Sequence, residues 1–218
     1  MKIQERLKDA KRVLIVVDMI NGFMKEGLLA DHKMMEIIPT AKNIIEEFIK
    51  ENYPIFAFRD VHTKLSPEHN NFSGLLPQMH CLAGSEEVDL ISELKPYERQ
   101  MIVIDKNATM GITSPITHSE IEYNFLSEYL VSLKQLVEVV LIGVCTDICI
   151  MDNAIPIKKT FDQLNINTRV TVPKNAVDTY HIDGIHDKQE WNKMAFRFMN
   201  QAGIYLPEEY VLERGKQK

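Results

Sequence analysis

Two cysteines lie within a short segment, Gly143-Val144-Cys145-Thr146-Asp147-Ile148-Cys149, which separates an apolar run from an amphipathic stretch. A cysteine at the start of a helix lies near unpaired backbone N–H groups and the positive end of the helix dipole, and both lower the pKa of its thiol. The same N–H groups can stabilise the oxyanion of a tetrahedral intermediate. Cys145 and Cys149 are therefore candidate nucleophiles, and the alternative is that both are small buried side chains.

An acid and a lysine also follow apolar runs directly. Asp18 comes after residues 12–17, and Lys106 comes after residues 101–105. A carboxylate in such a place can take the proton of a thiol and later return it to a leaving group. A lysine beside it can stabilise the thiolate and orient the carboxylate. The alternative is that Asp18 only caps a turn and that Lys106 is an ordinary solvent-exposed side chain.

A second group of residues has the types that bind metals. Asp60 and His62 are two residues apart after another apolar run, and His80 follows a proline-containing loop. Glu68 and His69 lie between them in the sequence. Imidazoles with a carboxylate suit Zn²⁺, Fe²⁺ or Mn²⁺, and so few protein ligands leave coordination positions open to water or substrate.

The candidate residues follow segments whose apolar pattern predicts strands. Strands are predicted at residues 12–17, 54–59, 101–105, 138–142 and 168–172, and helices at about residues 39–49, 121–136, 150–164 and 188–202. Apolar strands separated by helices predict a three-layer, Rossmann-like α/β fold with a mostly parallel central sheet flanked by helices. Such folds bind ligands beyond the carboxyl ends of their strands, so the candidates are expected to meet at one edge.

Length and composition exclude several classes of protein. The chain has 218 residues and a net charge of −6, without repeats or linker-like tracts, so we expect one domain over residues 1–218. The acidic balance argues against nucleic-acid binding, and no apolar run approaches the roughly 18–20 residues of a membrane span. The N-terminus lacks an apolar signal segment and the three cysteines do not suggest disulfides, which predicts a cytoplasmic location.

The motifs resemble those of a known family. Residues 16–23 (Val-Val-Asp-Met-Ile-Asn-Gly-Phe), residues 143–150 (Gly-Val-Cys-Thr-Asp-Ile-Cys-Ile) and Lys106 resemble the isochorismatase-like cysteine hydrolases. Within that superfamily, Asp60-Val61-His62 and residues 79–85 (Met-His-Cys-Leu-Ala-Gly-Ser) resemble the metal-dependent nicotinamidase/pyrazinamidase branch. The resemblance extends from about residue 12 to about residue 172 and implies the fold that the apolar pattern predicts.

The resemblance assigns roles to the first group of residues. It implies a catalytic triad of Asp18, Lys106 and Cys149, with Cys149 as the nucleophile. It also implies a cis peptide bond between Val144 and Cys145, and an oxyanion hole formed by the backbone N–H groups of Cys145 and Cys149.

The metal ligands that the resemblance implies are Asp60, His62 and His80. A fourth ligand would come from Glu68 or His69, of which we prefer His69. The cofactor implied is one divalent transition metal, zinc in the first place, with iron or manganese as alternatives.

The reaction implied is hydrolysis of a small amide, foremost nicotinamide to nicotinate and ammonia, through a thioester on Cys149. Phe23 falls where the family packs an aromatic ring against the substrate. Residues 74–79 and 107–115 lack the aromatic residues that the family has near these places, so a second ring is either missing or supplied by Phe72. These departures leave the triad unchanged and concern the substrate.

Three alternatives differ in chemistry. A metal-free amidase of the same superfamily, acting on a carbamoyl or ureido substrate, would not need the Asp60, His62 and His80 group. An ether hydrolase acting on isochorismate would not need Cys149. The third alternative is a non-catalytic interaction module. The expected partner is the small-molecule substrate, and a homo-oligomer is also expected from the family.

Overall fold

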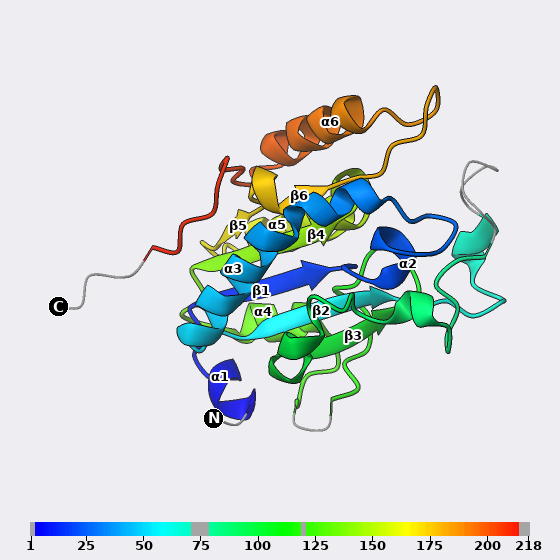
Figure 1. The fold of residues 1–218 in the computed structure, drawn as a ribbon. Coiled ribbons are helices and arrows are strands. Elements are labelled where there is room, and N and C mark those ends of the chain that lie inside the picture. The colour runs from blue at the N-terminus through cyan, green and yellow to red at the C-terminus, as the bar shows by residue number, and fades with distance from the viewer. Residues whose placement is uncertain (1–2, 71–78, 119–120, 214–218) are drawn as a thin grey trace.

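The predicted strands form one parallel sheet in the computed structural model, which describes residues 3–70, 79–118 and 121–213 (Figure 1). The strands are β1 (Arg12–Val17), β2 (Ile55–Asp60), β3 (Ile102–Lys106), β4 (Glu138–Val144), β5 (Arg169–Thr171) and β6 (Val177–Asp178). Among the described residues they pair in parallel in the order β3-β2-β1-β4-β5, and β6 pairs with β4 beyond β5. The predicted α/β fold is confirmed.

Helices cover both faces of this sheet. The longer ones are α3 (Ile38–Lys50), α4 (Leu126–Ser132), α5 (Met151–Gln163) and α6 (Lys188–Gln201). Successive side chains of a strand point to opposite faces. Leu14 and Val16 of β1 accordingly pack with α3, whereas Val13, Ile15 and Val17 pack with α4 and α5. Helix α6 packs beside α5 on the second face, which completes three layers.

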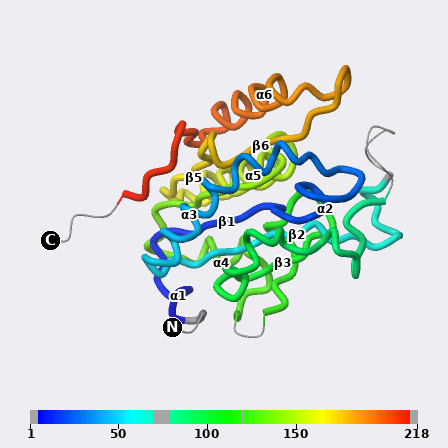
Figure 2. Tube along the Cα trace, in the orientation of Figure 1, coloured from blue at the N-terminus to red at the C-terminus, as the bar shows by residue number. Residues whose placement is uncertain are grey.

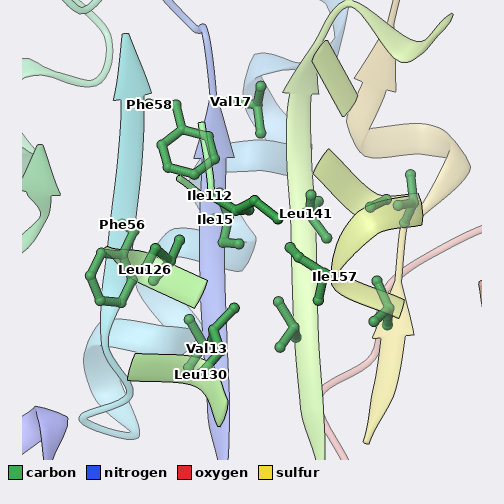
Figure 3. Close-up of a cluster of buried hydrophobic side chains, with 14 of the residues drawn as sticks. Val13, Ile15, Val17, Phe56, Phe58, Ile112, Leu126, Leu130, Leu141 and Ile157 are labelled. Carbon is green, nitrogen blue, oxygen red and sulfur yellow. The ribbon is translucent and has the colours of Figure 1, made fainter. Parts of the chain in front are cut away.

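The core on the second face is shown in Figure 3. Apolar side chains from β1, β2 and β4 meet those of α4 and α5 there, and the labelled residues are Val13, Ile15, Val17, Phe56, Phe58, Ile112, Leu126, Leu130, Leu141 and Ile157. Strands that are buried on both faces need apolar residues at nearly every position. This explains why the strand segments of the sequence are continuous apolar runs rather than alternating ones.

The remaining elements are short. They are α1 (Ile3–Leu7), α2 (Asn21–Met24), the 3₁₀ turns η1 (His32–Ile37), η2 (Pro67–Asn70), η3 (Glu86–Val88), η4 (Lys95–Gln100) and η6 (Lys174–Ala176), and a π-helical turn η5 (Thr146–Ile150). No helix of the described ranges is both long and apolar enough to cross a membrane.

The predicted helix over residues 121–136 is wrong in its extent. Only α4 is helical there, because the chain before it is extended: Ile116 donates its N–H to the carbonyl of Asn124, and Pro115 forms a bridge with Phe125. Strand β6 was not predicted from the sequence. Its two residues are too few to show a periodic pattern.

The strand order places the candidate residues together. The chain runs from β1 outward through β2 to β3, and then returns to place β4 on the other side of β1. The carboxyl ends of β1 and β4 therefore flank the point where the direction of winding reverses, which is the usual ligand site of such sheets. Figure 2 shows the segments that follow these strands gathered at that end of the sheet.

Candidate active site

A close contact between β1 and β4 brings the two central segments together. Gly143 lies opposite Val17 with a φ of +119°, and a Cβ at Gly143 would lie 2.1 Å from the Val17 carbonyl oxygen. Only glycine fits this backbone conformation and this approach. The peptide bond between Val144 and Cys145 that follows is cis, as expected. Asp18 leaves β1 with a φ of +49°, a left-handed conformation that aspartate tolerates better than most residues.

Lys106 lies at the centre of the predicted triad. Its side chain is completely buried, and its Nζ is 2.9 Å from Oδ2 of Asp18 and 3.7 Å from Sγ of Cys149. The structure therefore brings Asp18, Lys106 and Cys149 into one contact group. The three residues come from the ends of three different segments, after β1, at the end of β3 and after β4.

Lys106 also contacts the predicted metal group, a link that was not predicted. Its Nζ donates a hydrogen bond of 3.0 Å to Oδ1 of Asp60, because β2 and β3 pair with Asp60 opposite Lys106. Burial alone would lower the pKa of Lys106, but the charges of Asp18 and Asp60 outweigh it and hold this pKa well above its ordinary value. The ammonium group of Lys106 thus balances the charge of Asp18 in the predicted triad and that of Asp60 in the predicted metal group.

The pKa of the buried carboxyl group of Asp18 is raised from 3.8 to about 6. Burial is the main cause, the charge of Lys106 opposes it, and the charge of Asp60 adds to it. At neutral pH Asp18 is therefore mainly ionised, yet its pKa is close enough to neutrality for it to accept and return a proton.

The expectation of a lowered cysteine pKa is wrong. Burial raises the pKa of Cys149 well above its ordinary value, and the nearby Lys106 offsets only part of this effect. Burial and the carboxylate of Asp147 raise the pKa of Cys145 in the same way. Loss of solvent and neighbouring carboxylates thus raise the pKa of both thiols. Cys149 needs a base to become a nucleophile.

The predicted metal ligands lie together and are buried. Among the described residues, the ligand atoms of Asp60, His62 and His80 lie within 4.8 Å of one another. Nε2 of His62 is 2.9 Å and Nε2 of His80 is 3.5 Å from Oδ2 of Asp60. One carboxylate and two imidazoles are a donor set that suits zinc, iron or manganese.

The two candidates for a fourth ligand flank this group. The imidazole of His69 lies 4.8 Å from that of His62 and 5.3 Å from that of His80, between ring centroids. Both ring nitrogens of His69 and Oε2 of Glu68 are buried without a hydrogen-bond partner among the described residues, as is Nδ1 of His80. Buried polar atoms without partners are rare, so these residues fit a bound metal ion.

Asn107 orients one of these histidines, a role not predicted from the sequence. Its Oδ1 lies 3.3 Å from Nδ1 of His62 and accepts a hydrogen bond from the hydroxyl of Ser66. An N–H on Nδ1 leaves Nε2 of His62 free to bind a metal, which is the usual arrangement around a ligating histidine.

A pocket connects the two groups. It is lined by Phe23, Leu29, Asp60, Glu68, His80, Thr109, Cys145, Ile148, Cys149 and Tyr180. The predicted substrate contact Phe23 is therefore in the pocket, where its ring centroid lies 6.1 Å from that of His80. Phe72, the suggested second ring, lies outside the described residues. Tyr180 was not predicted from the sequence as a pocket residue.

The buried side chain of Asn153 holds the turn that carries Cys149. Asn153 accepts the N–H groups of Gly111 and Ile112 and donates to the carbonyls of Thr109 and Cys149. It thereby joins the cysteine turn to the loop that follows β3.

His186 lies with Nε2 3.0 Å from Oδ2 of Asp147, in the same turn. From the sequence, His186 is expected at the surface or in a loop, and a helix cap is one alternative for Asp147. The structure shows a buried pair, which sequence spacing cannot reveal because 39 residues separate them.

Comparison with known proteins gives a consistent result. Residues 12–206 match the model of the isochorismatase domain. Nicotinamidase 1 of Arabidopsis thaliana is 28% identical over 155 residues, which are 66% of this chain and 59% of that protein. The chain therefore spans less than two thirds of the length of this curated relative.

Solved structures of similar fold include enzymes with different substrates. The N-carbamoylsarcosine amidase of Thermoplasma acidophilum is 26% identical, with a TM-score of 0.67 over 94% of this chain and 99% of that one. The pyrazinamidase of Pyrococcus horikoshii, solved in complex with zinc, has the same fold at 23% identity, with a TM-score of 0.67 over 92% and 99% of the two chains. With the family match extending over most of the sequence, the chain belongs to the isochorismatase family of hydrolases.

Proposed function

We propose that this protein is a metal-dependent cysteine amidohydrolase that converts nicotinamide to nicotinate and ammonia. The observation that carries the proposal is the position of Lys106, which contacts Asp18 and Asp60 and lies 3.7 Å from Cys149. Cys149 and two of the metal-type ligands, Asp60 and His80, thus line one pocket, and Lys106 links them to the buried carboxylate of Asp18. This combination suits attack on an amide whose ring is held beside the metal group.

The first step would be attack by Cys149. Because burial raises the pKa of the thiol, it is protonated at rest and Asp18 takes its proton as the sulfur attacks the amide carbonyl. Lys106 stays protonated and balances the negative charges that remain. The backbone N–H groups of Cys145 and Cys149 are the proposed donors to the oxyanion.

The second half of the reaction would return the enzyme to its starting state. Asp18 gives its proton to the departing nitrogen, the carbon–nitrogen bond breaks and ammonia leaves, so that a thioester with Cys149 remains. Asp18 is then a carboxylate again and takes a proton from a water molecule that attacks the thioester. The acid product leaves and the proton returns to the Cys149 sulfur.

Asp60, His62 and His80 would hold a divalent metal, with zinc as the first choice and His69 as the proposed fourth ligand. When bound, this ion would supply a Lewis-acidic contact for a ring nitrogen or a water molecule. Phe23 would pack against the ring and orient it in the pocket. The carboxamide is then directed toward Cys149.

The test is ammonia release from nicotinamide, measured with the metal content of the same sample. We expect release that a chelator abolishes. The Cys149→Ala variant should lose turnover and keep its metal, and Cys81→Ala is the matched control because Cys81 is also buried but does not line the pocket. Turnover that survives in Cys149→Ala would contradict the thiol mechanism.

A second candidate is hydrolysis of a carbamoyl or ureido substrate without a metal. It is favoured by the similarity to the N-carbamoylsarcosine amidase over 94% of this chain. Absence of metal from the purified protein, with ammonia released from N-carbamoyl compounds and not from nicotinamide, would favour this candidate.

A further inference from the structure

Three aromatic rings form a continuous stack beside the pocket. The ring of Tyr180 lies on that of His186, with centroids 4.0 Å apart and planes at 19°. His186 lies in turn on Trp191, with centroids 4.7 Å apart and planes at 9°. Of these three residues, Tyr180 is the one that lines the pocket.

The middle ring of this stack is fixed at both of its nitrogens. Nε2 of His186 lies 3.0 Å from Oδ2 of Asp147, and Nδ1 lies 2.9 Å from the carbonyl oxygen of Tyr180. His186 is buried, so these contacts are protected from water. The orientation of the Tyr180 ring is therefore set by the turn that carries Cys149.

Asp31 links the backbone segments that carry Tyr180 and Phe23, two aromatic residues that line the pocket. Its Oδ2 accepts the N–H of His181, the residue after Tyr180, at 3.0 Å. Its own N–H donates to the carbonyl of Phe23 at 3.0 Å. The backbone segments that carry Phe23 and Tyr180 are thus held at a fixed spacing.

The two loops that lack the aromatic residues of the family supply no ring to the pocket among the described residues. The loop after β3 contributes Thr109 to the pocket, and Met79 is not among the lining residues and is half exposed. Within the described part of the lining, the phenyl and phenol rings are those of Phe23 and Tyr180.

We propose that Tyr180 is the second aromatic wall of the pocket and selects amides carried on a flat, unsaturated ring. The proposal rests on the proposed function for the amide group and goes beyond it in naming the residue that recognises the ring. A ring held rigidly on one face loses little freedom when a ligand ring packs against it, and aromatic pairs are favourable beyond their buried area. His186 would act as a positioning residue for Tyr180.

The experiment compares two probes of similar size that differ in flatness, benzamide and cyclohexanecarboxamide. Their binding is measured by calorimetry in buffer with zinc, on the full chain carrying Cys149→Ala so that neither probe is consumed. In this background Tyr180→Leu removes the ring and keeps an apolar side chain, and Tyr180→Phe keeps the ring.

We expect Tyr180→Leu to weaken benzamide binding about three- to tenfold, and to leave cyclohexanecarboxamide binding within about twofold. Tyr180→Phe should bind both probes as the parent does. Unchanged binding of cyclohexanecarboxamide also shows that the pocket of the variant is intact. Equal losses for both probes, no loss for benzamide, or no benzamide binding by the parent would overturn the proposal.

A failure of the proposed function would give results that differ from a failure of the proposal on Tyr180. If the protein with Cys149 released no ammonia from nicotinamide while benzamide binding still depended on the Tyr180 ring, the ring wall would stand and the assigned substrate would be wrong. If nicotinamide were hydrolysed while Tyr180→Leu left benzamide binding unchanged, the proposed function would stand and the role of the Tyr180 ring would be wrong.

Discussion

Replacing Asp18 with asparagine separates its role as a base from its effect on stability. The Asp18→Asn variant keeps the shape of the side chain and removes its charge. In the folded protein the pKa of this carboxyl is raised from 3.8 to about 6, mainly by burial. Its ionised form is therefore less favourable in the folded than in the unfolded protein by about 3 kcal/mol.

The sign of the pH dependence follows from this difference. Below pH 3.8 the carboxyl is protonated in both states and has no such cost. Between pH 3.8 and about 6 the unfolded chain ionises this carboxyl while the folded protein keeps it protonated, so the free energy of unfolding falls by about 3 kcal/mol over this range. The variant has no group to ionise at this position. It should match the wild type near pH 4 and exceed it by up to about 3 kcal/mol at pH 8.

The assay is urea unfolding of both proteins at pH 4, 6 and 8, in the presence of a chelator so that only protein charges contribute. Asp9→Asn is the matched control, because Asp9 has a similar left-handed backbone, with a φ of +53°, but is exposed. Ammonia release by the metal-loaded variant should fall by about 10²–10⁴-fold, because the amide cannot accept the thiol proton. A variant that becomes less stable relative to wild type as the pH rises would refute the reasoning, since the ion pair with Lys106 would then outweigh burial.

Three further predictions concern the backbone, the opposite end of the sheet and the metal group. Gly143→Ala should cost more than about 4 kcal/mol in urea unfolding, because its Cβ would meet the backbone of β1, whereas Gly184→Ala, with open space around it, should cost far less. Glu138→Gln should cost about 3–5 kcal/mol without lowering kcat, because it leaves the buried Arg12 without its counter-charge far from the pocket. His80→Ala should weaken zinc binding at least about a hundredfold in a chelator competition.

Each of these has an outcome that would contradict it. A soluble Gly143→Ala protein with wild-type stability would show that β1 and β4 can separate without cost. A loss of kcat in folded Glu138→Gln would mean that the amino end of β4 is coupled to the site. Full zinc occupancy in His80→Ala would exclude His80 as a ligand.

Much of the fold was predictable from the sequence because its strands are buried on both faces. Residues 12–17, which form β1, are apolar at five of six positions, so the strand and its end at Asp18 could be read directly. Helix α4 was predicted too long because residues 121–125 carry the same apolar spacing and are used for extended pairing instead. Apolar spacing does not distinguish these two uses, since tertiary contacts decide between them.

The sequence by itself determined which residues stand at the carboxyl ends of the strands, and Asp18, Lys106 and Cys149 were candidates on that basis. The sequence did not reveal that Lys106 also contacts Asp60, that burial raises the pKa of Cys149, or that His186 fixes Tyr180 at the pocket. These features depend on contacts between residues far apart in the chain and on the loss of solvent around them. The local spacing of residues predicts neither the long-range contacts nor the loss of solvent. Only the packed tertiary structure therefore decides the charge balance and the walls of the site.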